Sequence, residues 1–342
     1  METRILGATT EDIKIAAEII ANGGLVAFPT ETVYGLGANA LDAEAVGKVY
    51  AAKGRPSDNP MIVHISSKND ILKLTREITE DMRILMDKFW PGPLTMVVPA
   101  ETIIPKVTTG GLDTVAVRMP SNPIAAAIIS ESGVPIAAPS ANLSGKPSPT
   151  TCRHVIDDLD GRIDAIVAGD DCKVGIESTV VDMTGEMPVI LRPGIITGGQ
   201  MSEALGKKVN VDPALLEKPD IFNNGELLET GSNFKPKSPG MKYKHYAPKA
   251  EMIIYQGDRE KVAAVIAEEK LKRSEWGQRV EVIMYDDDEP ERAAKEFFAR
   301  LRACDKAEVD VILAAALKED GVGFAVMNRM FKSAGYNIIE VY

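Results

Sequence analysis

In residues 1–206, hydrophobic and polar positions follow two alternating patterns. Apolar residues three and four apart follow polar caps at Thr9–Asp12 and at Asp42, and both runs end at glycine, which predicts amphipathic helices. Short runs rich in valine and isoleucine predict strands, and they read LVAFPT, MIVHIS, LTMVVPA, TVAVRMP, VPIAAP, DAIVAG, STVVDM and PVILRP. This mixture predicts an α/β or α+β domain of about 200 residues.

Residues 250–342 repeat a simpler pattern, in which strand-like and helix-like runs alternate regularly. The strand-like runs are EMIIYQG, RVEVIMY, VDVILAAAL and NIIEVY. This alternation predicts a small parallel-sheet domain of the Rossmann-like type. No GxGxxG turn follows its first strand, so dinucleotide binding is not indicated.

Residues 207–249 separate these regions and show little periodicity, with several prolines and many lysines. A structureless segment of this length is either disordered or functional. Its Gly-Met-Lys-Tyr-Lys-His-Tyr run is too aromatic and basic for an inert spacer. We therefore expect three parts, namely a catalytic domain over 1–206, a linker or lid over 207–249 and a C-terminal domain over 250–342.

The composition is that of an ordinary soluble globular protein, with 342 residues, 45% hydrophobic residues and a net charge of −11. That charge argues against a protein that coats nucleic acid, because such work needs a broad basic face. Three scattered cysteines offer neither a zinc pattern nor a disulfide framework. No apolar run reaches about 18 residues and no cleavage site follows the N-terminus, so we expect a cytoplasmic protein.

Four cations stand near glycine, proline and strand ends. Lys53 and Arg55 precede a stretch broken by Pro56 and Pro60, and taken alone they are explained by the macrodipole at a helix C-terminus. Two further cations, Arg118 and Arg192, stand at the ends of predicted strands, where a buried cation needs an anion. Together the four favour one pocket for a polyanion over four solvated side chains.

Hydroxyl and amide side chains follow the apolar strand VPIAA, in the run PSANLSGKPSPT. Ligands of α/β sheets collect at the carboxyl ends of strands, although a plain loop that caps a helix with Ser148 or Thr150 would explain those two hydroxyls. The run FPTETVYGLG adds further hydroxyls around a glycine turn. The three histidines form no metal cluster, and no GxxxxGK[ST] loop exists, so a phosphate would be bound by something other than a P-loop.

At this point the chain resembles the YrdC-type threonylcarbamoyl-AMP synthases. KGRP together with Ser140 and Asn142 is similar to the family's Lys-x-Arg and Ser-x-Asn signature. The blocks FPTETVYGLG, DNPMIVHI, WPGPLT, AVRMP, APSANLSGKPSPT, ESTVVD and RPG match in order, and SPGMKYKHYAP with the last domain resembles the long two-domain form. The resemblance implies a twisted α/β sheet with a concave pocket, joined by a long linker to a smaller Rossmann-like domain.

The resemblance also implies a reaction. L-threonine, bicarbonate or CO2 and ATP would give L-threonylcarbamoyladenylate and pyrophosphate, the first step of threonylcarbamoyladenosine formation at position 37 of tRNA. Mg²⁺ would be carried by the ATP phosphates without protein ligands, and no organic cofactor is implied. A separate threonylcarbamoyl transferase complex would modify the tRNA, so we expect neither strong direct nucleic-acid binding nor membrane association.

Site residues are implied in the same way. Lys53 and Arg55 would be catalytic, neutralising phosphate charge as pyrophosphate leaves. ATP would be bound by Lys53, Arg55, Ser57, Asn59, Thr114, Ser140, Asn142, Ser148, Arg192, Tyr243 and His245. Threonine would be bound by Thr30, Tyr34, His64, Arg118, Ala138 and Ser178.

The resemblance also implies that Arg118 grips the threonine carboxylate in a bidentate manner. Three points stay open. The base that deprotonates threonine is unassigned, with His64 only a guess. Lys242, Tyr243 and His245 of the linker could close over the nucleotide as a lid, or the linker could merely tether the domains. An RNA-binding module and another carbamoyl transferase that uses the same domain remain as alternatives.

Overall fold

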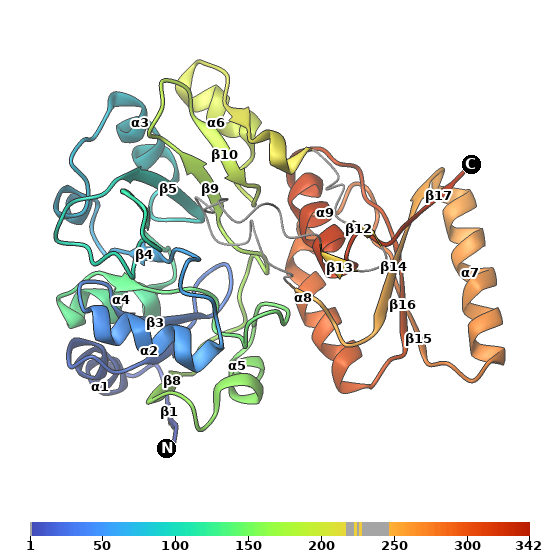
Figure 1. Ribbon diagram of the computed structural model, residues 1–342, viewed down its shortest axis with the longest axis horizontal. Coiled ribbons are helices and arrows are strands. Elements are labelled where there is room, and N and C mark those ends of the chain that lie inside the picture. The colour runs from blue at the N-terminus through green and yellow to red at the C-terminus, as the bar shows by residue number, and fades with distance from the viewer. Residues whose placement is uncertain (1, 217–221, 224–225, 228–245) are drawn as a thin grey trace.

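Two separate sheets organise the chain in the computed structural model, which describes residues 2–216, 222–223, 226–227 and 246–342 (Figure 1). The larger sheet belongs to the N-terminal part and the smaller one to the C-terminal part. Lys242, Tyr243 and His245 lie outside the described residues, so the lid stays a prediction.

Eleven short strands form the larger sheet. They are β1 (Arg4–Leu6), β2 (Val26–Phe28), β3 (Gly35–Asn39), β4 (Ile62–His64), β5 (Leu94–Pro99), β6 (Thr114–Arg118), β7 (Ile136–Ala137), β8 (Ala165–Val167), β9 (Thr179–Asp182), β10 (Val189–Arg192) and β11 (Asn210–Val211). Their spatial order is β1-β8-β2-β3-β7-β4-β6-β5-β9-β10-β11, with parallel and antiparallel pairs mixed. Sequence-distant segments therefore become neighbours at the strand ends.

The strand register brings predicted site residues together. The parallel pair β4 and β6 sets His64 opposite Arg118. The antiparallel pair β5 and β6 sets Thr95 opposite the same Arg118, and β9, beside β5, begins directly after Ser178. Four side chains from four segments thus meet at one end of the sheet.

Six helices flank this sheet among the described residues, and they begin and end as their caps dictate. They are α1 (Thr10–Ala21), α2 (Ala43–Lys53), α3 (Glu80–Phe89), α4 (Pro123–Ser132), α5 (Cys152–Leu159) and α6 (Gly198–Leu205), with short 3-10 turns at Lys68–Lys73 and Pro213–Leu215. The Asp42 side chain accepts hydrogen bonds from the first backbone N–H groups of α2, as predicted. Gly54 ends α2 in the left-handed conformation at φ 63°, so Lys53 is its last helical residue.

Hydrophobic clusters cover both faces of the sheet. On β2, Val26 and Phe28 pack with α1 and α4, whereas Ala27 between them packs with the cluster that includes α2, α3, α5 and α6. Successive residues of a strand point to opposite faces. The sheet is therefore the middle layer of three, and its strands from β2 to β10 are buried on both sides, whereas the edge strands β1 and β11 are not.

The smaller sheet is entirely parallel, with the order β15-β16-β14-β17. Its strands are β14 (Glu251–Gly257), β15 (Val280–Ile283), β16 (Val311–Ala315) and β17 (Ile338–Val341), and its helices are α7 (Arg259–Glu275), α8 (Pro290–Lys306) and α9 (Gly321–Ser333). A short pair, β12 (Phe222–Asn223) and β13 (Glu226–Leu227), stands apart. The predicted Rossmann-like parallel arrangement is confirmed.

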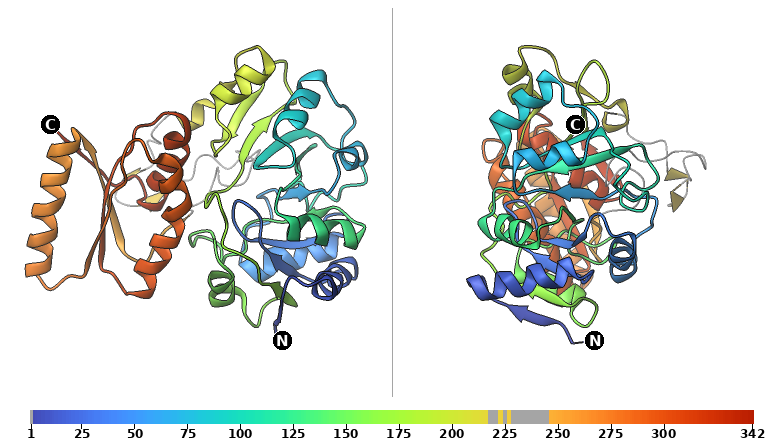
Figure 2. Two further views of the ribbon diagram at one scale, coloured as in Figure 1. Left: turned by 180° about the vertical axis from the view of Figure 1, so that it is seen from behind. Right: turned by 90° about the vertical axis from the view of Figure 1, so that its left-hand side faces the viewer.

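The two parts of the chain share a packed interface. Figures 1 and 2 show α8 and α9 between the small sheet and the larger part, with α7 on the far side. One hydrophobic cluster includes Val33 and Ile176 of the larger part together with Phe297 and Phe298 of α8. Since β11 pairs with β10, the larger sheet continues past residue 206, and the predicted boundaries at 206 and 249 stay predictions.

A buried ion pair also crosses this interface. The Arg302 guanidinium lies 2.7 Å from a carboxylate oxygen of Asp158, whose side chain is 1% exposed, and it donates to the carbonyl of Pro147. Replacing Arg302 by methionine should lower the free energy of unfolding by about 3 kcal/mol, because it leaves a buried carboxylate short of a partner. Chemical denaturation measures this loss.

Arg300→Met is the matched control on the same helix. Arg300 pairs with Glu281 within the C-terminal part, and their side chains are 30% and 45% exposed. Removal of such a pair should cost about 1 kcal/mol or less. Equal losses for the two variants would contradict the importance of the interface pair.

Candidate active site

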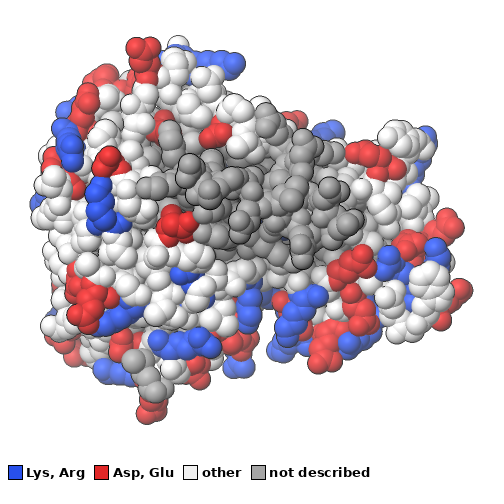
Figure 3. Space-filling model, in the orientation of Figure 1, with Lys and Arg blue, Asp and Glu red and all other residues white. Residues whose placement is uncertain are grey.

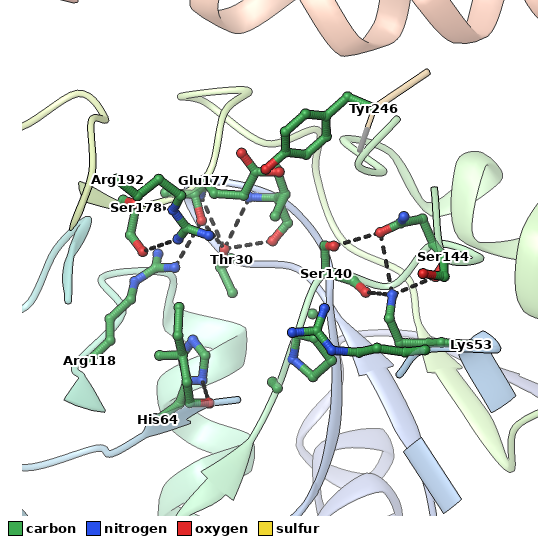
Figure 4. A pocket seen from close by; sticks show the side chains of 18 of the residues that line it. Thr30, Lys53, His64, Arg118, Ser140, Ser144, Glu177, Ser178, Arg192 and Tyr246 are labelled. Carbon is green, nitrogen blue, oxygen red and sulfur yellow. Dashed lines mark hydrogen bonds between the residues drawn. The ribbon is translucent and has the colours of Figure 1, made fainter. Parts of the chain in front are cut away.

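A cavity opens at the strand ends where the register gathers these side chains (Figure 4). Its empty space is about 710 Å³, open solvent at the mouth included. Ten of the predicted site residues line it: Thr30, Lys53, Arg55, His64, Arg118, Ala138, Ser140, Asn142, Ser178 and Arg192. The sequence-based expectation of one pocket with four cations is therefore met by the geometry.

Lys53 stands at one end of the cavity, where α2 stops. Its Nζ donates to the carbonyls of Ser140 and Asn142 and lies 3.4 Å from the Asn142 side-chain oxygen. Burial, with the Arg55 charge acting the same way, lowers the pKa of Lys53 well below its ordinary value. An anion at this end would stabilise the charged form, so the site is suited to phosphate.

The loop beside Lys53 is tied down by its own side chains. Ser140 Oγ donates to Asn142 Oδ1 at 2.5 Å, and Asn142 Nδ2 donates to the carbonyls of Leu143 and Lys146 at 2.8 and 2.9 Å. Arg55 donates to the carbonyl of Pro60 at 3.0 Å. Side-chain hydrogen bonds thus hold the Ser140–Gly145 loop against the end of α2.

Arg118 stands at the opposite end and is almost fully buried. Its Nη2 lies 2.8 Å from Glu31 Oε1, its Nη1 donates to Thr32 Oγ1 at 3.0 Å, and its Nε donates to the Gly92 carbonyl at 3.4 Å. Nη1 and Nε donate hydrogen bonds, whereas Nη2 faces Glu31 as an ion pair without a hydrogen bond. A ligand carboxylate would have to displace Thr32 or Glu31 to form the expected bidentate grip, which stays a prediction.

A second arginine reaches the same end. Arg192 Nε donates to the Ser178 carbonyl at 3.0 Å and its Nη2 to Ser178 Oγ at 3.1 Å. Burial lowers the pKa of Arg192 to about 10, and the charge of Arg118 acts in the same direction. Two buried guanidiniums that repel each other are stabilised by an anion between them.

Local turns orient the remaining side chains of the cavity. Thr30 Oγ1 donates to the Val33 carbonyl at 2.6 Å and accepts from two backbone N–H groups, which closes the FPTETV turn. Gly194 allows close packing beside Arg192, because a Cβ there would lie 2.5 Å from the Thr179 backbone nitrogen. Figure 4 shows Thr30, Ser178 and both arginines on one side and Lys53 with Ser140 and Ser144 on the other.

His64 lies in the floor of the cavity with 3% of its surface exposed. Its Nδ1 is 3.2 Å from the Ile62 carbonyl. Burial and the nearby Arg118 lower the pKa of His64 to about 3. With so low a pKa the imidazole is neutral in this arrangement, and the base that deprotonates threonine stays unassigned.

His64 should make the protein sensitive to acid. The unfolded chain binds a proton below a pKa near 6.5 while the folded chain does so only near 3, so the stabilisation is complete above pH 6.5 and is lost as the pH falls. Over that window the contribution changes by about 1.4 kcal/mol per pH unit. His64→Gln should lower the slope of stability against pH in denaturation experiments between pH 6 and 4, and an unchanged slope would contradict this.

Comparison with known proteins identifies the family of this chain. Residues 18–194 match a family model described as "Telomere recombination", and residues 197–335 match one described as "Threonylcarbamoyl-AMP synthase, C-terminal domain". The threonylcarbamoyl-AMP synthase of Pyrococcus abyssi is 49% identical over 96% of each chain, and that of Bacillus subtilis is 44% identical over 98% of this chain and 96% of the relative. This chain belongs to the threonylcarbamoyl-AMP synthase family.

A solved structure agrees with that membership over the whole length. The crystal structure of P. abyssi Sua5 complexed with L-threonine has a TM-score of 0.90 and 47% sequence identity, and the match covers 99% of this chain and 100% of that chain. The resemblance inferred from the sequence and the predicted two-part α/β fold are confirmed. As a member of the threonylcarbamoyl-AMP synthase family, the chain is an enzyme.

Five predicted residues of this family member do not line the cavity. Ser57 is exposed, and Thr114 starts β6 at the end opposite Arg118. Tyr34 is fully buried and exchanges hydrogen bonds with Gly169. A hydroxyl close to a motif in sequence can point away from the cavity in space, and the assignment of these three residues to the substrates stays a prediction.

Two of the five act behind the cavity wall instead. Ser148 donates to Glu177 Oε1 at 2.5 Å and is fully buried. Asn59 is buried, and its carbonyl accepts from the hydroxyl of Tyr50 at 3.0 Å. Both residues therefore lie behind the cavity wall and do not line the cavity.

Several lining residues were missed from the sequence. Glu177, Tyr246 and the Ser144–Gly145 turn line the cavity, and Glu31 engages Arg118 from just behind it. Burial raises the pKa of Tyr246 to about 12, with the charge of Glu177 and a hydrogen bond to Glu177 adding to the shift. Glu31 and Glu177 stand inside quoted motifs, so their positions were visible, but their partners were not.

Among the described residues of this synthase-family chain, no group of three or more His, Cys, Asp and Glu side chains could hold a metal ion. Both carboxylates at the cavity are paired with arginines, Glu31 with Arg118 and Glu177 with Arg329. Within the same residues, no helix is both long enough and apolar enough to cross a bilayer.

Proposed function

We propose that this protein makes L-threonylcarbamoyladenylate and pyrophosphate from L-threonine, bicarbonate or CO2, and ATP. One observation carries the proposal: a single cavity joins two buried cationic ends, with Lys53 and Arg55 at one and Arg118 and Arg192 at the other. A triphosphate and an amino-acid carboxylate are both anions. Two anionic substrates can therefore be held at once with their reacting groups facing each other.

The chemistry needs such an enclosure. The threonine amine adds to CO2 and loses a proton, giving a carbamate; with bicarbonate the same carbamate forms and water leaves. A carbamate oxygen then attacks the α-phosphorus of ATP, and the bond to the β-phosphate oxygen breaks to release pyrophosphate. The carbamate is unstable in water, so holding it beside ATP in a shielded cavity favours adenylate formation over its loss.

The nucleotide is assigned to the Lys53 end. Lys53 and Arg55 offset charge on the phosphates as pyrophosphate leaves. Ser140 and Asn142 present the loop that Lys53 holds, and Ser144 with Gly145 extends the same wall. Because all three Lys53 N–H groups have acceptors in this loop, a phosphate oxygen would replace the longest contact, that to Asn142 Oδ1 at 3.4 Å.

Threonine is assigned to the end with Arg118, where Arg192 also lies although the resemblance gave that arginine to ATP. Its carboxylate would lie between the two guanidiniums and displace Thr32 Oγ1 from Arg118. Thr30, Ser178 and Ala138 line the space beside them, and neutral His64 forms the floor. The distance between the two ends would then be spanned by the carbamate and the α-phosphate.

Mg²⁺ would enter with the phosphates of ATP and offset part of their charge. The two carboxylates at the cavity are paired with arginines, so the donor set suits an ion that the phosphates and water hold and not one held by the protein. The chain's own residues supply binding and charge, and the proposal needs no organic cofactor.

The adenylate would pass to a separate threonylcarbamoyl transferase complex that modifies tRNA, and we propose that both act in the cytoplasm. The face in Figure 3 intersperses acidic and basic side chains without a continuous basic area among its described residues. This favours a small-molecule enzyme over an RNA-binding module. A different carbamoyl transferase is disfavoured because the full-length relatives named above share both parts of the chain.

The direct test is the identity of the product. Purified protein is incubated with MgATP, L-threonine and 13C-labelled bicarbonate, and the nucleotides are separated and weighed by mass spectrometry. The proposal predicts an adenylate that carries threonine and one labelled carbon. Formation of an unlabelled threonyl adenylate, or of no adenylate, would contradict it.

A further inference from the structure

A guanidinium from the C-terminal part reaches the back of the cavity. Arg329, in α9, is completely buried and donates from Nε to Glu177 Oε2 at 3.1 Å. Its Nη1 donates to the Pro193 carbonyl, and its Nη2 lies 3.4 Å from the Glu177 carbonyl. The two segments that it joins carry Ser178 and Arg192, which line the cavity.

The ion pair with Arg329 affects the cavity because Glu177 itself faces that cavity. It lines the cavity and its other carboxylate oxygen accepts from Ser148 at 2.5 Å. Without a cation behind it, Glu177 would present an unbalanced negative charge to any anionic substrate. In a buried setting, where water screens little, such a charge strongly opposes anion binding.

The groups around Glu177 come from several elements. Arg329 and Lys332 face it from α9, Arg192 from β10, Ser148 from the loop before α5, and Tyr246 from the segment before β14. Burial raises the pKa of Glu177, but Arg329 first, then Arg192 and Ser148, outweigh it and hold that pKa below its ordinary range. Glu177 is thus an anion whose charge Arg329 offsets most strongly.

Resting on the proposed function, we propose that Arg329 is a positioning residue for the reaction: it offsets the charge of Glu177, so that the cavity accepts anionic substrates. The C-terminal part then contributes to substrate binding and does not only pack against the catalytic part. It supplies a buried charge on which substrate affinity depends, although Arg329 itself does not line the cavity.

The test compares MgATP affinity by calorimetry in four full-length proteins: wild type, Arg329→Met, Glu177→Gln and the Glu177→Gln/Arg329→Met double variant. At pH 8, Arg329→Met should weaken MgATP binding about tenfold or more, because an unpaired carboxylate faces the cavity. The weakening should shrink as the pH is lowered, since Glu177 without Arg329 takes up a proton more readily.

The double variant separates a charge effect from a structural one. Wild type and double variant carry the same net charge at the wall, so their MgATP affinities should agree within about threefold, whereas a loosened wall would weaken both Arg329 variants alike. If Arg329→Met does not fold, the double variant decides alone. An unchanged affinity in Arg329→Met, or a loss that is equal at every pH and persists in the double variant, would overturn the inference.

Two further measurements distinguish a failure of this inference from a failure of the proposed function. Arg300→Met, on α8, removes an ion pair that lies within the C-terminal part and should leave MgATP affinity unchanged; a loss equal to that of Arg329→Met would overturn the inference. Adenylate synthesis by wild type is assayed in parallel. A wild type that binds MgATP but makes no adenylate refutes the proposed function, and the affinity comparison still decides the role of Arg329.

Discussion

Replacing Lys53 by methionine should lower kcat/KM for adenylate formation about a thousandfold, the size of effect seen when a charge that stabilises phosphoryl transfer is removed. Two losses combine in this variant. The cavity loses a cation at its nucleotide end, and the carbonyls of Ser140 and Asn142 lose the donor that holds their loop. Steady-state pyrophosphate release measures the change.

Lys48→Met is the matched control for Lys53→Met. Lys48 lies on the same helix, its side chain is 49% exposed, and it pairs with Glu44. Its replacement should leave kcat/KM within about threefold of wild type. A Lys53→Met protein that keeps wild-type kcat/KM would refute the assignment of the phosphates to this end of the cavity.

Replacing Arg118 by methionine should raise KM for threonine about a hundredfold and weaken MgATP binding by about tenfold at most, because the buried cation is lost at the threonine end of the cavity. The loss also leaves Glu31 without its cation, although its side chain is only 9% exposed. Arg118→Lys should give an intermediate KM, since it keeps the charge but not the planar fork. Initial rates at varied threonine, with ATP saturating, measure this.

Thr114→Val tests the same strand at its far end. Thr114 begins β6, and Arg118 ends it. Because Thr114 does not line the cavity, its replacement should leave KM for both substrates within about threefold. A large rise of KM for ATP in Arg118→Met, without a rise for threonine, would contradict the assignment of the two ends.

The fold was predictable because its signals are local. Asp42 before an apolar helix and Gly54 after it mark the bounds of α2, so the position of Lys53 at a helix end could be expected from the sequence. The regular alternation after residue 250 likewise predicted a parallel sheet. In contrast, the order of eleven strands depends on long-range pairing, and no local pattern predicts that β5 lies between β6 and β9.

The cations of the site were predictable for a related reason. A buried arginine at a strand end needs an anion, and Arg118 and Arg192 both line the cavity where one could bind. The hydroxyl residues were less predictable, because a hydroxyl is as often a structural donor as a ligand. Tyr34 bonds to Gly169 and Ser148 to Glu177, and the direction of each side chain is set by packing with segments far along the chain.

The sequence alone could not show which charged side chains pair with one another. Arg329 and Glu177 are 152 residues apart and meet only when the two parts of the chain dock. Glu31 stands inside the motif FPTETV after β2, yet its partner Arg118 ends β6, and only the long-range order of the strands brings the two together. A single sequence identifies such residues but does not say which charges are balanced.

The most direct test of the account is pyrophosphate release by purified protein with MgATP, with threonine and bicarbonate omitted in turn. A cavity with one end for each anionic substrate predicts release only when both are present, with one adenylate formed for each pyrophosphate. Release at an undiminished rate without threonine, or ATP bound and never cleaved in the complete mixture, would contradict the account.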